Sequence, residues 1–181
     1  MASRPYKIHN EQYPYFITAN LRFGLPLFCN PSAVTFLLAN LEFLRNKRGV
    51  KLIAYVIMEN HFHAILHGDD LADKISQFKS YSARKIIDSF KMDQHSRWLK
   101  RMKRVKPAYK NDQEFQFWEE SYHPKQVVGD EMMMQKINYI HQNPVKRGYV
   151  DKPEYWRYSS ARNYLGEEGL IPVDIFKGRA G

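Results

Sequence analysis

Two histidines separated by one residue are the first feature of the chain that could do chemistry. His61 and His63 lie in an apolar stretch that favours an extended strand, with Phe62 between them. Residues two apart in a strand project from the same face, so both imidazoles would share one side of the strand. Two ring nitrogens at this spacing can bind one metal ion, although a bare pair is also compatible with two solvated side chains. The pattern indicates a candidate metal site.

A tyrosine and an asparagine form a second candidate. Tyr139 and Asn143 are four residues apart in a segment of helical periodicity, which places them on one helix face. Met133, Ile137 and Ile140 give that helix an apolar stripe that would dock it on a sheet. A phenol hydroxyl and an amide oxygen would then be presented together. Taken alone, the pattern favours a packing role for Tyr139, with its hydroxyl hydrogen-bonded at the tip.

The elements that position these residues follow from apolar periodicity and from helix-ending residues. A helix is predicted between Asn30, which can cap it, and Gly49, which follows its end. Further helices are predicted at residues 71–91 and 130–142, the last stopped by Pro144. Strands are predicted at residues 13–22, 50–58, 61–66 and 115–122. This β-α-β-β-α-β order with a third helix predicts an α+β fold, a ferredoxin-like antiparallel sheet with helices on one face.

Length and composition set the class of protein. The 181 residues suggest a single domain over residues 1–181, with a core of about 13–165. Lys and Arg number 28 against 19 Asp and Glu, a net charge of +9 that indicates a polyanionic partner. Cys29 is the single cysteine, which excludes an internal disulfide and fits a reducing cytoplasm. Neither a signal peptide nor an apolar run long enough to span a bilayer is apparent, so we expect a cytoplasmic protein without membrane association.

Basic residues gather in two parts of the chain. Residues 97–110 carry seven cations and no acid, and a smaller group precedes them. Aromatic residues that could stack on unpaired bases lie among or beside them. For each basic side chain the alternative is ordinary solvated charge, and Trp118 is also compatible with the core. The residues expected to contact DNA phosphates are Lys79, Arg84, Lys85, Arg97, Lys100, Arg101, Lys103 and Arg104.

Four segments, taken together, resemble a known family. Residues 55–63 (YVIMENHFH) are similar to the histidine-hydrophobe-histidine motif of the REP-associated tyrosine transposases, and residues 139–150 (YIHQNPVKRGYV) resemble their tyrosine-helix signature. Residues 117–122 (FWEESY) and 156–161 (WRYSSA) are similar to an aromatic strand and a Trp-x-x-Ser-Ser segment of that family. Two residues depart from the pattern. Glu59 stands where proline is usual, and His123 stands where aspartate is common.

The resemblance implies the HUH nuclease fold and a specific chemistry. It implies that His61, His63 and Asn143 hold a divalent metal, Mg²⁺ or Mn²⁺, and that Tyr139 is the nucleophile. A phenol with a pKa near 10 is a poor nucleophile at neutral pH, and a metal on the scissile phosphate compensates by making the phosphorus more electrophilic. Attack by Tyr139 would leave a 5′-phosphotyrosine and a free 3′-OH, so that a second 3′-OH could reverse the reaction and join strands. The expected partner is single-stranded or hairpin DNA, and the protein would act as a monomer or homodimer.

Two other functions fit the same sequence. One is a domesticated protein that binds hairpin DNA without transposition activity. The other is a metal-dependent protein that binds or cleaves RNA. Covalent attachment to DNA would separate the transposase from both.

Overall fold

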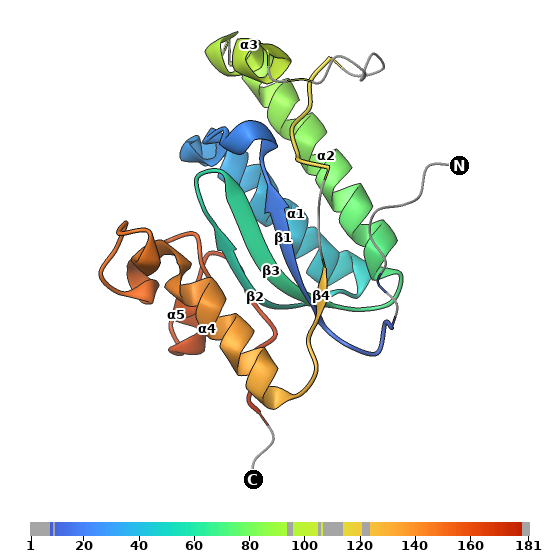
Figure 1. The fold of residues 1–181 in the computed structure, drawn as a ribbon, viewed down its shortest axis with the longest axis vertical. Helices are drawn as coiled ribbons and strands as arrows, with labels where there is room; N and C mark the ends of the chain where they lie inside the picture. Colours follow the sequence, from blue (N-terminus) through green and yellow to red (C-terminus); the bar gives the residue numbers. More distant parts are fainter. Residues whose placement is uncertain are drawn as a thin grey trace.

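An antiparallel sheet of four strands forms the centre of the molecule (Figure 1). The computed structural model describes residues 8, 10–93, 96–104, 106, 114–120 and 124–178. Its strands are β1 (Tyr15–Asn20), β2 (Lys51–Ile57), β3 (His61–His67) and β4 (Lys125–Gln126), in the spatial order β2-β3-β1-β4. With one α-helix between β1 and β2 and two between β3 and β4, this is the ferredoxin-like arrangement that the sequence predicts. The α+β fold class is confirmed.

The helices are α1 (Pro31–Arg48), α2 (Leu71–Met92), α3 (Ser96–Arg104), α4 (Asp130–Lys146) and the short α5 (Ala161–Tyr164). The predicted ends of α1 are confirmed: the side chain of Asn30 accepts a hydrogen bond from the Ser32 backbone, and Gly49 adopts a left-handed conformation. Three short 3-10 helices lie at Arg22–Gly24, Leu27–Cys29 and Pro153–Tyr155. None of the helices in the described ranges is long and apolar enough to cross a membrane.

Helices cover both faces of the sheet. Helices α1 and α2 pack on one face over the larger apolar core, which contains Ile17, Phe62 and Phe78. Helix α4 packs on the other face over a smaller apolar cluster, in which Ile137 and Ile140 meet strand residues. The expected placement on one face therefore holds for α1 and α2 but is wrong for α4 (Figure 1). The composition of β2 explains why helices cover both faces of the sheet and not one. Every residue of β2 after Lys51 is buried, and an unbroken apolar strand requires cover on both sides.

The fourth strand lies later in the chain than predicted. Residues 114–120 form no regular strand, and Trp118 makes one isolated bridge with Leu21. Gln116, Phe117 and Trp118 are buried in succession, so this segment lacks the alternation of a strand with one exposed face. The Trp118 indole also donates to the Lys79 carbonyl, 2.9 Å away, which ties the segment to α2. Strand β4 instead pairs Lys125 and Gln126 with Phe16 and Tyr15 of β1.

Helix α4 continues past the proline that was expected to stop it. Pro144 lies inside the helix, which ends at Lys146. The residue has no N–H to donate, but it lies in the last turn, where only one helical hydrogen bond is lost. The turn is closed by the Arg147 N–H, which donates to the Asn143 carbonyl at 3.1 Å, and by the Tyr149 N–H, which donates to the Pro144 carbonyl at 3.0 Å. Asn143 therefore remains helical, on the same face as Tyr139.

Candidate metal and nucleophile site

His61 and His63 project from β3 toward α4. Phe62, between them, is buried in the core on the opposite face. The ring centroids of the two histidines are 4.9 Å apart, with the rings inclined at 73°. The ring of His63 also lies 5.4 Å from that of Tyr139 on α4. The prediction that both imidazoles share one strand face is confirmed, and this face is the one turned toward α4.

Polar neighbours hold both imidazoles in place. Nδ1 of His61 lies 2.7 Å from Oδ1 of Asn60, an amide oxygen that can only accept, so this nitrogen carries the proton. Nδ1 of His63 lies 2.8 Å from the hydroxyl of Thr18, its partner on β1. Neither of these two contacts involves Nε2, the ring nitrogen that would bind a metal. A hydrogen bond at the second ring nitrogen is the usual support for a metal-binding histidine.

Burial keeps both histidines neutral at physiological pH. It is the largest cause that lowers the pKa of His63, to about 3, and the nearby His61 lowers it further. Burial also lowers the pKa of His61, and Arg147 adds to this effect, while Glu59 and a hydrogen bond with the Asn143 side chain oppose it. Only a neutral imidazole can donate a lone pair to a metal. The pair therefore suits metal binding at neutral pH.

Tyr139 lies at the edge of this site and not in the core. Its side chain is 41% exposed. The ring meets Phe16 edge-on, with centroids 5.7 Å apart, and Nζ of Lys146 lies 5.6 Å from the ring centroid. The sequence allows Tyr139 to be either a packing residue or a nucleophile. This exposure disagrees with a purely internal packing role.

Asn143 completes the set of residues that the sequence singled out. It lies one turn after Tyr139 and shares a hydrogen bond with His61. The described part of the chain contains no group of three or more His, Cys, Asp or Glu residues that could hold a metal. A metal bound here would therefore depend on two imidazole nitrogens and one amide oxygen. That donor set fits a divalent cation with positions left for phosphate oxygens and water.

Four residues beside the site have structural parts that sequence reasoning did not predict: Thr18, Glu59, Arg147 and Tyr149. Nη2 of Arg147 lies 3.3 Å from Oε1 of Glu59, which joins the end of α4 to the turn between β2 and β3. Burial, the negative charge of Glu59 and a hydrogen bond with it raise the pKa of the adjacent Tyr149. The sequence marks Glu59 only as a departure from the usual proline, and Thr18 becomes recognisable only once its register with His63 is known. Position 123 lies outside the described residues.

The eight predicted DNA-contacting residues lie elsewhere, along α2 and α3. Arg97, Lys100, Arg101 and Arg104 line one hollow on α3, whose Met102 is anchored in the core. Lys103 pairs with Glu114 at 3.9 Å. On α2, Arg84 and Lys85 are exposed, whereas Lys79 is half-buried and donates to the Glu119 carbonyl at 3.4 Å. Helix α3 lies at the end of α2 that is remote from α4 (Figure 1). Positions 107–110 of the basic stretch lie outside the described residues.

The fold and site together define a class: a ferredoxin-like sheet on which two strand histidines face a helix that carries a tyrosine. The solved structure of the REP-associated tyrosine transposase bound to a REP hairpin has this fold, with a TM-score of 0.63 and 19% sequence identity over 97% of this chain and 92% of that chain. A protein from Deinococcus radiodurans R1 that is provisionally described as a transposase has a TM-score of 0.46 and 20% identity, over 70% of this chain and 87% of that one. No family model and no curated protein matches the chain. The first likeness confirms the fold that the sequence resemblance implied.

Proposed function

We propose that the protein is a metal-dependent tyrosine transposase of the REP-associated type, which nicks and transfers single-stranded DNA. The observation that carries the proposal is the convergence of His61, His63, Tyr139 and Asn143 between β3 and α4. These residues come from parts of the sequence nearly eighty positions apart, and the His63 and Tyr139 rings nevertheless lie 5.4 Å apart. The sharing of fold with a transposase that binds a hairpin supports the same substrate here.

The reaction would proceed by transesterification at phosphorus. The Tyr139 oxygen attacks the scissile phosphate, the bond from phosphorus to the 3′ oxygen breaks, and the proton lost by the phenol is balanced by protonation of the leaving 3′ oxygen. A 5′-phosphotyrosine results, and attack by another 3′-OH releases Tyr139 and joins the strands. A divalent metal, when bound by the two histidines and Asn143, would polarise the phosphate and offset its developing charge.

Each side chain has a distinct part in this scheme. His61 and His63 supply neutral nitrogen ligands, because burial holds the pKa of each below its ordinary value. The partial exposure of Tyr139 leaves its hydroxyl open to a DNA strand. Because Asn143 and Tyr139 share one helix face, the third ligand and the nucleophile would keep a fixed separation. The basic surface of α2 and α3 would hold the DNA by its phosphates.

The direct test is formation of a covalent adduct. The protein is incubated with single-stranded hairpin DNA from the flanks of its own gene and Mn²⁺, and the products are separated on a denaturing gel. We expect a protein–DNA adduct with wild type and none with Tyr139→Phe, although that variant should still bind the hairpin. Tyr155→Phe, which alters another exposed tyrosine, is the matched control and should still form the adduct.

The remaining outcomes separate the alternatives. An adduct that survives in Tyr139→Phe would mean another nucleophile, with Tyr122 and Tyr149 the first to examine. Hairpin binding without any adduct would favour the domesticated DNA-binding protein. Cleavage of RNA and not of DNA would favour the third interpretation of the sequence.

A further inference from the structure

Helix α4 packs over β3, and side chains of the two elements meet in successive pairs. The ring of Tyr139 meets that of His63, with centroids 5.4 Å apart. One helical turn later, the side chain of Asn143 forms a hydrogen bond with His61. Four residues of a helix advance by about 6 Å and two residues of a strand by about 6.7 Å, so the two spacings match. The pairs therefore follow one line along the site.

A third pair continues this line beyond the proposed ligands. Arg147 is four residues after Asn143, and Glu59 is two residues before His61. Nη2 of Arg147 lies 3.3 Å from Oε1 of Glu59. Both charges act on His61, since Arg147 lowers the pKa of that residue and Glu59 raises it. This charged pair therefore lies next to the metal site, on the face of the sheet that α4 covers.

The arginine is the open side of this charged pair. The side chain of Arg147 is 48% exposed, whereas that of Glu59 is 17% exposed. A guanidinium carries several N–H donors in a planar fork that suits a phosphate, so it can bind one without leaving the carboxylate. Lys146, whose Nζ lies 5.6 Å from the centroid of the Tyr139 ring, adds a second cation beside the nucleophile. A DNA strand that leaves Tyr139 along this line therefore meets positive charge.

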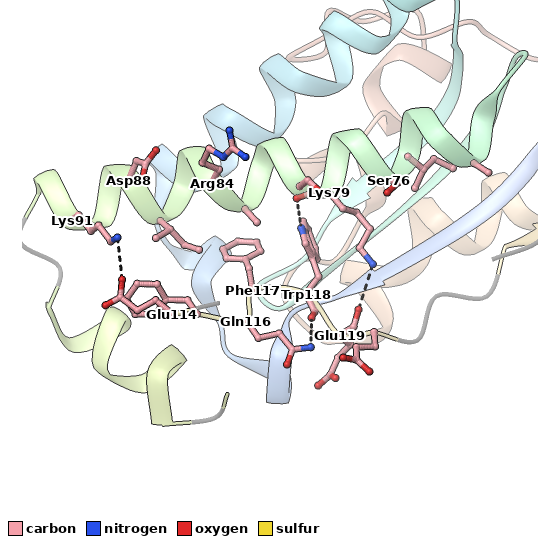
Figure 2. Close-up of a pocket in the computed structure, with 17 residues that line it drawn as sticks. Ser76, Lys79, Arg84, Asp88, Lys91, Glu114, Gln116, Phe117, Trp118 and Glu119 are labelled. Atoms are coloured by element: carbon pink, nitrogen blue, oxygen red, sulfur yellow. Dashed lines mark hydrogen bonds and ion pairs between the residues drawn. The ribbon is translucent and has the colours of Figure 1, made fainter. Parts of the chain in front are cut away.

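A groove between α2 and residues 114–120 is less suited to a phosphate near the cut (Figure 2). Helix α2 covers the face of the sheet opposite α4, so the sheet separates this groove from the histidines. Four carboxylates line the groove against three cations, and Lys91 already pairs with Glu114 at 3.3 Å. A phosphate would meet repulsion there. The end of α4 offers cations next to the cut without that excess of carboxylates.

We propose that Arg147 is a substrate-positioning residue that binds one of the two phosphates flanking the scissile phosphate. The proposal rests on the proposed function, because it places the scissile phosphate between Tyr139 and the two histidines. The step from Asn143 to Arg147 is about 6 Å, which is of the same order as the distance between successive phosphates of an extended single strand. A strand with its scissile phosphate at the first two pairs therefore brings a neighbouring phosphate to the third. Two anchored phosphates align the scissile bond with the attacking oxygen of Tyr139.

The test neutralises one phosphate of the DNA at a time. The cut is mapped from the adduct that the wild-type protein forms with hairpin DNA. Methylphosphonates, which lack the negative charge, then replace each phosphate of the single-stranded flank in turn, and affinities for the Tyr139→Phe protein are measured with Mn²⁺. We expect binding to weaken about tenfold, or about 1.4 kcal/mol, when one particular phosphate next to the scissile one is neutral.

Arg147→Met, made in the Tyr139→Phe protein, assigns that phosphate to its partner. Intact DNA should bind about tenfold more weakly, and the slope of log K against log salt should fall by about 0.7. The methylphosphonate at the sensitive position should cause no further loss, because its contact is already absent. The matched control is Arg48→Met, which removes an arginine from the last turn of α1 on the opposite face of the sheet and should bind like the parent protein.

Glu59→Gln separates a phosphate contact from a purely structural effect of the ion pair. This variant breaks the pair but keeps the guanidinium, so its binding should remain sensitive to the same methylphosphonate. If that sensitivity disappears, the effect follows the ion pair and not Arg147, and the proposal is wrong. Should Arg147→Met fail to fold, the double variant with Glu59→Gln, which leaves no unpaired carboxylate, carries the same measurement.

Other outcomes overturn the proposal. If the effects of Arg147→Met and the methylphosphonate simply add, Arg147 does not contact that phosphate. Equal affinity for every methylphosphonate next to the cut would exclude the contact while the adduct, and with it the proposed function, stands. Absence of any adduct with the wild-type protein would overturn both.

Discussion

The hydroxyl of Thr18 lies 2.8 Å from Nδ1 of His63, across the pairing of β1 with β3. This contact fixes the ring that also meets Tyr139 edge-on. Removal of a group that orients a metal-binding histidine typically costs ten- to a hundredfold in metal affinity. We therefore expect Thr18→Val, which keeps the shape of the side chain, to weaken Mn²⁺ binding by about that factor, as measured by electron paramagnetic resonance titration.

The control for Thr18 is Thr35→Val. The Thr35 hydroxyl donates to the Pro31 carbonyl at the start of α1 and has no role in the site. Its loss should leave Mn²⁺ affinity unchanged. If wild type and Thr18→Val bind Mn²⁺ with equal affinity, the contact between Thr18 and His63 does not support metal binding.

The basic face of α3 should govern the salt dependence of DNA binding. Each phosphate contact to a single strand contributes about 0.7 to the slope of log K against log salt, so Arg101→Ala with Arg104→Ala should lower that slope by roughly 1.4. The loss should be similar for specific and scrambled hairpins, because phosphate contacts carry no sequence information. Fluorescence anisotropy at several salt concentrations measures the slope. Replacement of two other exposed cations, Lys47 and Lys51, is the matched control, and an unaltered slope in the α3 variant would place the DNA path elsewhere.

Acid should weaken the fold through His141. Burial lowers the pKa of this residue to about 4, and its Nε2 lies 2.9 Å from the Ser160 hydroxyl. An unfolded chain takes up the proton near pH 6.5, so between that pH and about 4 the unfolded state binds more protons and stability falls as the pH falls. At the acid end of this window, His141 lowers the free energy of unfolding by up to about 3 kcal/mol.

Urea unfolding at neutral pH and near the acid end of that window measures this effect. His141→Gln keeps a donor for Ser160 but cannot titrate, so its free energy of unfolding should fall less on acidification than that of wild type. A parallel fall in both proteins would show that His141 is not the responsible group. His61 and His63 have lowered pKa values too, and they contribute equally to both proteins.

The pair formed by Glu59 and Arg147 should stabilise the end of α4. Arg147→Met leaves the largely buried Glu59 carboxylate without this cation, and we expect a loss of about 1 kcal/mol, because Arg147 is half exposed and solvent screens the pair. In the double variant, Glu59→Gln also removes the negative charge of the carboxylate, and part of the lost stability should return. Thermal unfolding of both single variants and the double variant gives the coupling energy. A double variant that is no more stable than Arg147→Met alone would exclude this explanation.

Local signals made much of this molecule predictable. Asn30 and Gly49 define the ends of α1 without reference to any other element, and the spacing of His61 and His63 defines their shared face. The prediction that Pro144 ends α4 is wrong because the energetic cost of a proline in a helix depends on its position. Pro144 is tolerated in a last turn that neighbouring backbone groups close. The burial of Gln116 and the meeting of Glu59 with Arg147 depend on tertiary contacts, which no local pattern encodes.

The placement of α4 on its own face of the sheet also has a consequence for the integrity of the site. Tyr139 and Asn143 are held by the smaller apolar cluster, whereas β3 lies against the larger core as well. Segments held by fewer buried contacts open more readily than the rest of a protein, as separate cooperative units. Backbone amides of α4 should therefore exchange with deuterium sooner than those of β3. Local opening of this one helix would remove the proposed nucleophile and the proposed third ligand together, while the rest of the fold stays intact.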